Sequence, residues 1–207
     1  MSLSRTSKLL RSSALALFIA SFALPAVAEP GAKSAAATAA EAAGIRIDNF
    51  GQVDQTYYRG AQPAGSDYAN LAKLGVQTLI DLTSDDSDPG ERAATEAAGM
   101  KYLHIPMTTH ESPTPGQIAE FLEAVDNPLN QPVYVHCVGG RHRTGVMTAV
   151  YRMVHDSWNA DKAFSEMKQY KFGADFLHAE FKDFVYGYKP APAVAATAAV
   201  EATAKMK

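Results

Sequence analysis

Residues 132–153 read PVYVHCVGGRHRTGVMTAVYRM, and this stretch decides the fold. Its first four residues are short, apolar and β-prone, which predicts a strand. From residue 145 to residue 153 apolar side chains recur at helical spacing, which predicts a helix. The segment therefore reads as strand, loop and helix. Backbone N–H groups and the positive end of the helix dipole then point at whatever occupies the loop.

The loop combines residue types that bind a phosphate group around a thiol. Gly139 and Gly140 allow the backbone to form a concave nest of N–H groups, which binds anions. Cys137 is the only cysteine of the chain, and we expect it to be a nucleophile because thiols at helix N-termini ionise readily. Arg143 offers a planar fork for two phosphoryl oxygens, which lysine does not. The expected phosphate-binding residues are Val138, Gly139, Gly140, Arg141, His142 and Arg143.

Residues 136–145 carry the pattern His-Cys-x-x-Gly-x-x-Arg-Thr-Gly, which resembles the signature loop of the cysteine-dependent protein tyrosine and dual-specificity phosphatases. The resemblance implies that Cys137 forms a phosphocysteine intermediate and that Arg143 clamps the phosphate. It also implies that the hydroxyl of Thr144 helps the cysteine leave when water attacks, and that His136 orients the surroundings of the cysteine.

Weaker motifs extend the resemblance over residues 57–170. Residues 58–63, YRGAQP, are similar to the opening of the bacterial, plant and fungal atypical branch of this family. Residues 79–82 and 104–106 are placed where those enzymes carry matching strands. Arg59, in the first motif, has either a supporting role near the pocket or an exposed place at a strand end. Asp81, in the second, is a candidate for the edge of the pocket.

Three other interpretations of the loop stay open. Cys137 could be a buried structural residue, since free cysteine is among the most buried residue types. Sulfur-transfer enzymes of the rhodanese kind also use a cysteine loop, although the Arg-Thr-Gly ending disfavours them. A third possibility is a phosphate-recognising binding module with negligible turnover.

The general acid is the least certain element of the site. Phosphatases of this kind carry an aspartate after the His-Ile-Pro strand, but here Thr109 occupies the nearest position. Glu111 is the only carboxylate of that loop, and His110 is a second candidate because an imidazole can carry a proton near neutral pH. The alternative is that Glu111 is solvated and His110 packs against the loop. Asp85, Asp86 and Asp88 are typical of a solvated turn, although one of them could reach the edge of the pocket.

The pair Arg141-His142 indicates how many phosphate groups the substrate carries. It resembles the Lys-His pair of the plant and fungal branch, some of whose members act on inositol polyphosphates. Extra positive charge at the loop favours substrates with several phosphates. Alternatively, Arg141 pairs with the protein's own carboxylates.

The first 28 residues predict a cleavable signal peptide. Arg5, Lys8 and Arg11 precede an apolar stretch too short to span a membrane, and a small-x-small site ends at Ala28. We therefore expect a periplasmic or secreted protein without a stable membrane anchor. Loss of these three cations changes the formal net charge from -3 to -6. A negative net charge does not attract nucleic acid, so we expect no nucleic-acid partner.

The remaining chain predicts one domain. Residues 29–44 form an alanine-rich linker, residues 45–189 the phosphatase-like domain, and residues 190–207 a disordered tail rich in alanine and proline. Strands alternating with helices predict an α/β fold, in which helices flank a central, mostly parallel sheet and the site lies at the carboxyl ends of the strands. The expected strands are 51–53, 56–59, 76–82, 101–105 and 132–135, and the expected helices are 66–73, 89–98, 115–125, 145–153, 159–170 and 174–186.

The aromatic residues near the end of the domain and the remaining histidines complete the predictions from the sequence. The aromatic-rich stripe over residues 176–185 predicts packing against the sheet, rather than a ligand groove. The remaining histidines, His104, His155 and His178, lack a paired ligand spacing, so we expect no metal and no cofactor. We expect a monomeric, exported phosphatase whose partner is a phosphorylated protein, with an inositol phosphate as the alternative substrate.

Overall fold

The computed structural model describes residues 40–84 and 87–190. The predicted signal peptide, residues 29–39 of the predicted linker, and residues 191–207 of the predicted tail lie outside the described residues. Asp85 and Asp86 also lie outside them. None of the described helices is long and apolar enough to cross a membrane.

Five strands form one sheet, in the order β1-β2-β5-β3-β4. Their bounds are β1 (Gly51–Gln52), β2 (Tyr57–Ala61), β3 (Thr78–Thr83), β4 (Lys101–Met107) and β5 (Val133–Cys137). Only the pair β1 and β2 is antiparallel, whereas β2 with β5, β5 with β3, and β3 with β4 are parallel. The predicted mostly parallel sheet is confirmed.

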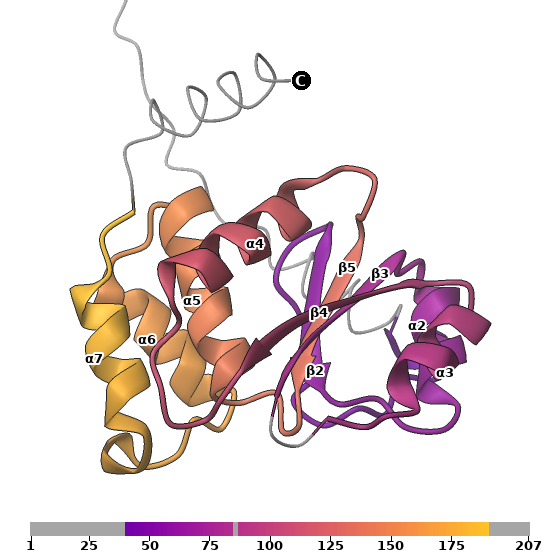
Figure 1. Cartoon of the computed structure of the whole chain (residues 1–207), viewed down its shortest axis with the longest axis horizontal. Helices are drawn as coiled ribbons and strands as arrows, with labels where there is room; N and C mark the ends of the chain where they lie inside the picture. The colour runs from indigo at the N-terminus through magenta and orange to yellow at the C-terminus, as the bar shows by residue number, and fades with distance from the viewer. Residues whose placement is uncertain (1–39, 85–86, 191–207) are drawn as a thin grey trace, which may run out of the picture. The chain divides into compact units, whose positions relative to one another are not determined.

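Helices cover both faces of this sheet (Figure 1). One face carries α2 (Asp67–Leu74) and α3 (Glu91–Ala97), and the other carries α4 (Pro115–Asp126), α5 (Arg143–His155), α6 (Ala160–Gln169) and α7 (Ala179–Gly187). Each face has its own hydrophobic core, because successive side chains of a strand point to opposite faces. On β5, for example, Val133 and Val135 belong to the core beneath α4 to α7, and Tyr134 belongs to the other.

Residues 173–187 depart from the predicted helix 174–186. Gly173 has a φ of 87°, and a short 3-10 helix, η1 (Asp175–His178), precedes α7. Phe181 and Val185 are buried as expected, but Phe176 is 80% exposed and Leu177 is 63% exposed. The prediction that the whole stripe packs against the sheet was wrong at these two positions, because the 3-10 turn breaks the helical spacing on which it depended.

The topology brings four strand ends to one edge of the sheet. β2 ends at Ala61, β3 at Thr83, β4 at Met107 and β5 at Cys137, and these strands are parallel. The segments that follow them therefore meet at the carboxyl edge, which is where open α/β sheets bind their ligands.

Candidate active site

Cys137 is the last residue of β5, and Arg143 is the first residue of α5. The five residues between them form the loop, called the phosphate loop below. Cys137 is a free thiol that is only 3% exposed. The first backbone N–H groups of α5 have no partner within the helix, so this end of the helix favours an anion in the loop.

Gly140 fixes the shape of the phosphate loop. Its φ is 62°, and a Cβ at this position would lie 2.3 Å from the carbonyl carbon and oxygen of Gly60. Only glycine permits both this backbone conformation and this close approach. At Gly139, a Cβ would meet only the side chain of Arg141, at 3.4 Å or more.

The YRGAQP motif lies directly beneath the phosphate loop. Arg59 is fully buried, and its Nη2 donates a hydrogen bond of 2.7 Å to the carbonyl oxygen of Gly140. Its guanidinium carbon lies 3.9 Å from the ring centroid of Tyr170. The backbone N–H of Gln62 donates to the carbonyl oxygen of Val138 over 3.2 Å. This burial excludes the alternative of an exposed Arg59, and burial lowers the pKa of its guanidinium.

Arg143 links the phosphate loop to the end of β4. Its side chain is 2% exposed, and Nη1 donates a hydrogen bond of 3.1 Å to the carbonyl oxygen of Met107. The Thr144 hydroxyl is buried and has no hydrogen-bond partner among the described residues. The two predicted polar side chains after the loop are therefore held inside the protein, next to the helix N-terminus.

The side chains of Arg141 and His142 turn away in different directions. Arg141 is exposed, and its Nη2 lies 3.6 Å from Oδ2 of Asp48. Lys171 also pairs with Asp48, at 2.5 Å. The ring of His142 contacts the carbonyl oxygen of Phe172 at 3.0 Å, so of the two predicted phosphate ligands His142 can offer only its backbone to the loop. An arginine that pairs with a carboxylate of the protein is the alternative stated above for Arg141.

His142 and His178 form a contact that joins three segments. Their ring centroids are 3.7 Å apart, and Nδ1 of His178 lies 3.2 Å from the carbonyl oxygen of Thr109. Burial is the main cause that lowers the pKa of His142, and the neighbouring His178, Arg141 and Arg143 lower it further. The neutral ring can then donate to the carbonyl of Phe172.

The loop after β4 is anchored at two points. Thr109 is held by His178, and Oγ of Ser112 donates to the carbonyl oxygen of Glu180 over 3.1 Å. The two candidate acids lie between these points, and the side chains of both His110 and Glu111 are exposed. Exposure agrees with a solvated Glu111, and it also leaves Glu111 open to a bound substrate.

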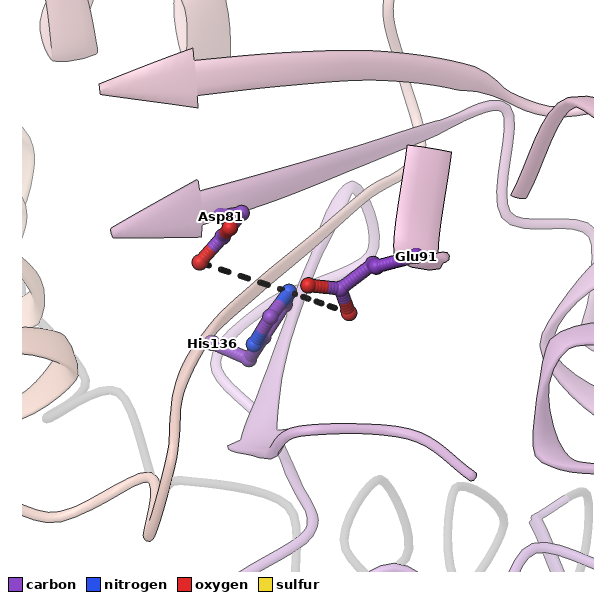
Figure 2. Close-up of side chains that lie close together, drawn as sticks. All are labelled: Asp81, Glu91 and His136. Carbon is purple, nitrogen blue, oxygen red and sulfur yellow. Dashed lines mark ion pairs between the residues drawn. The ribbon is translucent and has the colours of Figure 1, made fainter. Parts of the chain in front are cut away.

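A buried cluster of charged residues lies behind the phosphate loop, on the α3 face of the sheet. Asp81, Glu91 and His136 lie close together (Figure 2), and all three are fully buried. Nε2 of His136 lies 3.2 Å from Oε1 of Glu91 and 4.0 Å from Oδ1 of Asp81. Asp81 therefore lies beside His136, in the neighbouring strand, and its register partner is His136 itself.

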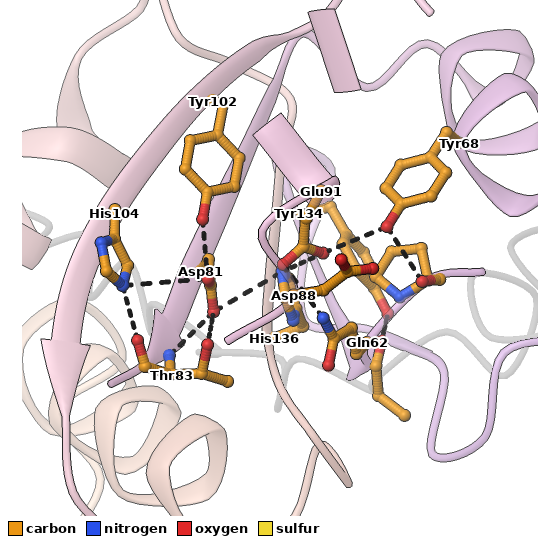
Figure 3. Close-up of polar contacts among 12 residues, drawn as sticks. Gln62, Tyr68, Asp81, Thr83, Asp88, Glu91, Tyr102, His104, Tyr134 and His136 are labelled. Atoms are coloured by element: carbon orange, nitrogen blue, oxygen red, sulfur yellow. Dashed lines mark hydrogen bonds and ion pairs between the residues drawn. The ribbon is translucent and has the colours of Figure 1, made fainter. Parts of the chain in front are cut away.

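Hydrogen bonds surround this cluster (Figure 3). Oδ1 of Asp81 accepts from the backbone N–H and the hydroxyl of Thr83, at 2.8 and 2.7 Å, and Oδ2 accepts from the hydroxyl of Tyr102 at 2.7 Å. Burial and the Asp81 carboxylate hold the pKa of Tyr102 above its usual range, so the hydroxyl keeps the proton that it donates.

Glu91 was not among the site residues predicted from the sequence. The residue follows Asp88, Pro89 and Gly90, and a polar run after a turn is usually solvent-exposed. One signal in the sequence was available: Asp81 lies in the apolar strand 79–82. A buried charge needs polar partners, so the position of Asp81 predicted that polar residues from elsewhere in the fold would lie beside it.

Within the described residues, Asp81, Glu91 and His136 form a group that could hold a metal ion, because their ligand atoms lie within 4.8 Å of one another. The hydrogen bonds already made by Asp81 oppose this use. Neither ring nitrogen of His136 has a hydrogen-bond partner among the described residues, whereas a metal-bound imidazole usually donates its second N–H. Asp81 is better explained as a hydrogen-bond acceptor for Thr83 and Tyr102 than as a metal ligand.

Comparison with known proteins agrees with this geometry. Residues 41–183 match the family model described as DSP-PTPase phosphatase fused to NAD+ kinase. This chain belongs to the cysteine-dependent protein tyrosine and dual-specificity phosphatase family. It is a phosphatase, as the sequence pattern of the loop predicted.

Three relatives show the range of the family. "Probable tyrosine-protein phosphatase DG1060" of Dictyostelium discoideum is 30% identical over 126 residues, which are 59% of this chain and 75% of that protein. Dual specificity protein phosphatase TpbA of Pseudomonas aeruginosa is 30% identical over 126 residues, 60% of this chain and 56% of the relative. Inositol diphosphatase SIW14 of Saccharomyces cerevisiae is 26% identical over 133 residues, 62% of this chain and 47% of the relative.

Solved structures of two of these relatives share the fold. The crystal structure of TpbA from P. aeruginosa has a TM-score of 0.60 at 27% identity, and the match covers 69% of this chain and 86% of that one. The core catalytic domain of SIW14 from S. cerevisiae also has a TM-score of 0.60, at 23% identity, over 70% of this chain and 88% of that one. The second likeness concerns the fold alone.

Proposed function

We propose that this phosphatase hydrolyses phosphate monoesters of phosphotyrosine and phosphothreonine proteins through a phosphocysteine intermediate, outside the cytoplasm. One observation carries the mechanism: Cys137 and Arg143 stand at the two ends of a glycine loop, between the carboxyl end of β5 and the N-terminus of α5. The family to which the chain belongs supports the same reaction.

In the first step, the thiolate of Cys137 attacks the phosphorus atom of the bound monoester. A bond between Sγ and phosphorus forms, and the bond between phosphorus and the ester oxygen breaks. Arg143 and the backbone N–H groups of residues 138–143 stabilise the charge that spreads over the phosphoryl oxygens. The leaving oxygen takes a proton from the general acid, for which we propose Glu111.

In the second step, water attacks the phosphocysteine. The acid of the first step, now deprotonated, takes a proton from the water. The bond between sulfur and phosphorus breaks, inorganic phosphate leaves, and the thiolate returns. The Thr144 hydroxyl, which is buried and has no partner among the described residues, is available to donate to the departing sulfur.

The charges around the phosphate loop favour a substrate that carries one phosphate group over a substrate that carries several. Asp48 pairs with both Arg141 and Lys171 and so offsets the charge of these two exposed cations. An inositol polyphosphate is the alternative substrate. The inositol diphosphatase among the relatives favours it, as does the Arg141-His142 pair when it is considered as sequence alone.

Export is proposed from the sequence alone. The charged segment before the apolar stretch, and the small residues before Glu29, are typical of a secretory signal. N-terminal sequencing of the protein recovered from the producing cell tests this proposal, since cleavage after Ala28 would leave Glu29 as the first residue.

Phosphate release tests the activity. The purified protein is given an aryl phosphate, a phosphotyrosine peptide and an inositol polyphosphate, and Cys137→Ser and Glu111→Gln are measured alongside. We expect turnover by the parent protein and none by Cys137→Ser. Glu111→Gln should lose activity mainly on substrates with poor leaving groups, by roughly 10²- to 10⁴-fold.

Glu120→Gln is the matched control for the acid, because Glu120 is an exposed glutamate on α4. Equal rates in Glu111→Gln and Glu120→Gln on every substrate would rule out Glu111 as the acid. Tight retention of phosphopeptide by the parent without release of phosphate would favour a binding module, which the missing aspartate at position 109 suggests.

A further inference from the structure

We propose that Glu91 is a positioning residue of the phosphate loop, which acts on Cys137 through His136 and on Val138 through Gln62. Its catalytic consequence rests on the function proposed above, but its effect on phosphate binding does not depend on turnover. Glu91 lies at the start of α3, outside every motif that marks the family in this sequence.

The first arm of the proposal runs from Glu91 to His136. Oε1 of Glu91 lies 3.2 Å from Nε2 of His136, which directly precedes Cys137. The imidazole stacks on Tyr134 with a centroid separation of 5.9 Å. Neither ring nitrogen has a hydrogen-bond partner among the described residues, and of the two carboxylates near Nε2, Glu91 at 3.2 Å is closer than Asp81 at 4.0 Å. We therefore infer that the approach of Glu91 positions the ring, and through it the end of β5 that carries the nucleophile.

The second arm runs from Glu91 to Gln62 (Figure 3). Nε2 of Gln62 donates to Oε2 of Glu91 over 3.3 Å, and the backbone N–H of the same glutamine donates to the carbonyl oxygen of Val138 over 3.2 Å. The hydroxyl of Tyr68 lies 3.5 Å from Oε1 of Glu91. Each oxygen of the carboxylate is thus directed at a different segment that supports the phosphate loop.

The burial of Glu91 makes a positional role the better explanation of this carboxylate. The side chain is fully buried, and burying a charge opposes folding even when the charge has partners. An apolar residue would fill the same space without that cost, but it could not hold His136 and Gln62 at once. Misplacing a reacting group by about 1 Å can lower the rate by about 10²-fold, so a distant anchor can matter to catalysis.

Two substitutions separate position from charge. Glu91→Gln removes the charge but keeps both arms. The new amide oxygen can accept from His136, and the new amide nitrogen can donate to the oxygen of Gln62 after the Gln62 amide group rotates by 180°. Glu91→Ala removes both arms. Tyr151→Phe is the destabilising control, because it removes a hydrogen bond of 2.5 Å to Asp54, which lies before β2 at the other end of the sheet.

The readout is the alkylation of Cys137 by iodoacetamide, with and without inorganic phosphate, at a temperature at which each protein is folded. Protection by phosphate gives the affinity of the phosphate loop even if the protein turns over no substrate. A second readout is kcat/KM on an aryl phosphate. Failure of the parent to turn over any substrate would overturn the proposed function, and protection by phosphate would still test Glu91.

We expect Glu91→Ala to lose phosphate protection and to lower kcat/KM by about 10²-fold, while Glu91→Gln stays near the parent on both readouts. Tyr151→Phe should lower the melting temperature without changing either readout. If Glu91→Ala lowers only the melting temperature, or if Glu91→Gln and Glu91→Ala lose protection equally, the positioning role is wrong.

Gln62→Ala keeps the proposal testable if Glu91→Ala does not fold. It cuts one arm and leaves the contact between Glu91 and His136 intact. We expect a smaller loss of phosphate protection than complete removal of Glu91 would give, and protection equal to that of the parent would contradict the second arm.

Discussion

The carbonyl oxygen of Gly140 accepts a hydrogen bond of 2.7 Å from Nη2 of Arg59, which lies 81 residues earlier in the chain. The donor is a fully buried guanidinium on β2, and the acceptor is the residue whose left-handed backbone shapes the phosphate loop. The phosphate loop is therefore not held by its own residues alone, because a residue of the neighbouring strand β2 also supports it.

We expect Arg59→Lys to destabilise the protein. An ammonium cannot both lie flat on Tyr170 and donate in the plane to Gly140, and a buried carbonyl left without a donor costs about 1–3 kcal/mol. The free energy of unfolding, measured in urea, should fall by about that amount. Arg92→Lys is the control, since Arg92 is exposed and pairs with Glu96 at 3.6 Å. Equal losses in the two variants would contradict the supporting role of Arg59.

The two adjacent glycines of the phosphate loop should respond differently to alanine. Gly140→Ala places a Cβ against the backbone of Gly60 at a φ of 62°, and we expect a loss of about 2–5 kcal/mol from the left-handed conformation and the overpacking together. Gly139→Ala meets only a flexible side chain and should change stability by no more than about 1 kcal/mol. Thermal unfolding of both variants measures this difference, and a tolerated Gly140→Ala would show that the loop geometry is wrong.

The half-buried ring of His142 should make the stability of the protein depend on pH. Burial holds its pKa below the ordinary value in the folded protein. The unfolded state therefore binds more protons as the pH falls from about 7 to below 6, and stability falls with it. In His142→Gln this loss disappears, so the melting temperature of the parent should decrease more steeply over that range. Parallel pH profiles for the two proteins would contradict the assignment.

Removing Asp48 should shift the preference toward substrates with several phosphates. Its carboxylate pairs with Arg141 at 3.6 Å and with Lys171 at 2.5 Å, and Asp48→Asn leaves both cations uncompensated. We expect a tighter Kd for an inositol polyphosphate than in the parent, a smaller change for an aryl phosphate, and a difference that decreases with added salt. Asp156→Asn, which loses a carboxylate that pairs with Arg152, should change neither affinity.

Local patterns predicted the strand, loop and helix around Cys137, because a single segment supplies the strand, the glycines and the helix start. They also predicted the parallel sheet and its functional edge. They did not predict that Glu91 is buried beside His136, because nothing in the polar residues 88–91 shows that this carboxylate of α3 packs against β5. The exposure of Phe176 and Leu177 was missed because the aromatic spacing was interpreted as one continuous helix, whereas these two residues lie in the 3-10 helix η1.

The support of the phosphate loop shows the same limit. Arg59 could be either exposed or near the pocket on sequence grounds, and only its contact with Gly140 and Tyr170 distinguishes the two. These contacts join residues far apart in the chain, so they depend on strand order, which the sequence pattern leaves open. The identity of the acid depends on how an exposed loop meets a substrate, which neither pattern nor packing determines.

In the proposed mechanism, Cys137 carries the phosphoryl group during turnover. Rapid acid quenching during turnover of an aryl phosphate, followed by peptide mapping of the phosphoenzyme, tests it most directly. We expect a phosphoryl group on Cys137 in the parent protein and no phosphoenzyme in Cys137→Ser. Turnover with the phosphoryl group on another residue, or undiminished turnover by Cys137→Ser, would contradict it.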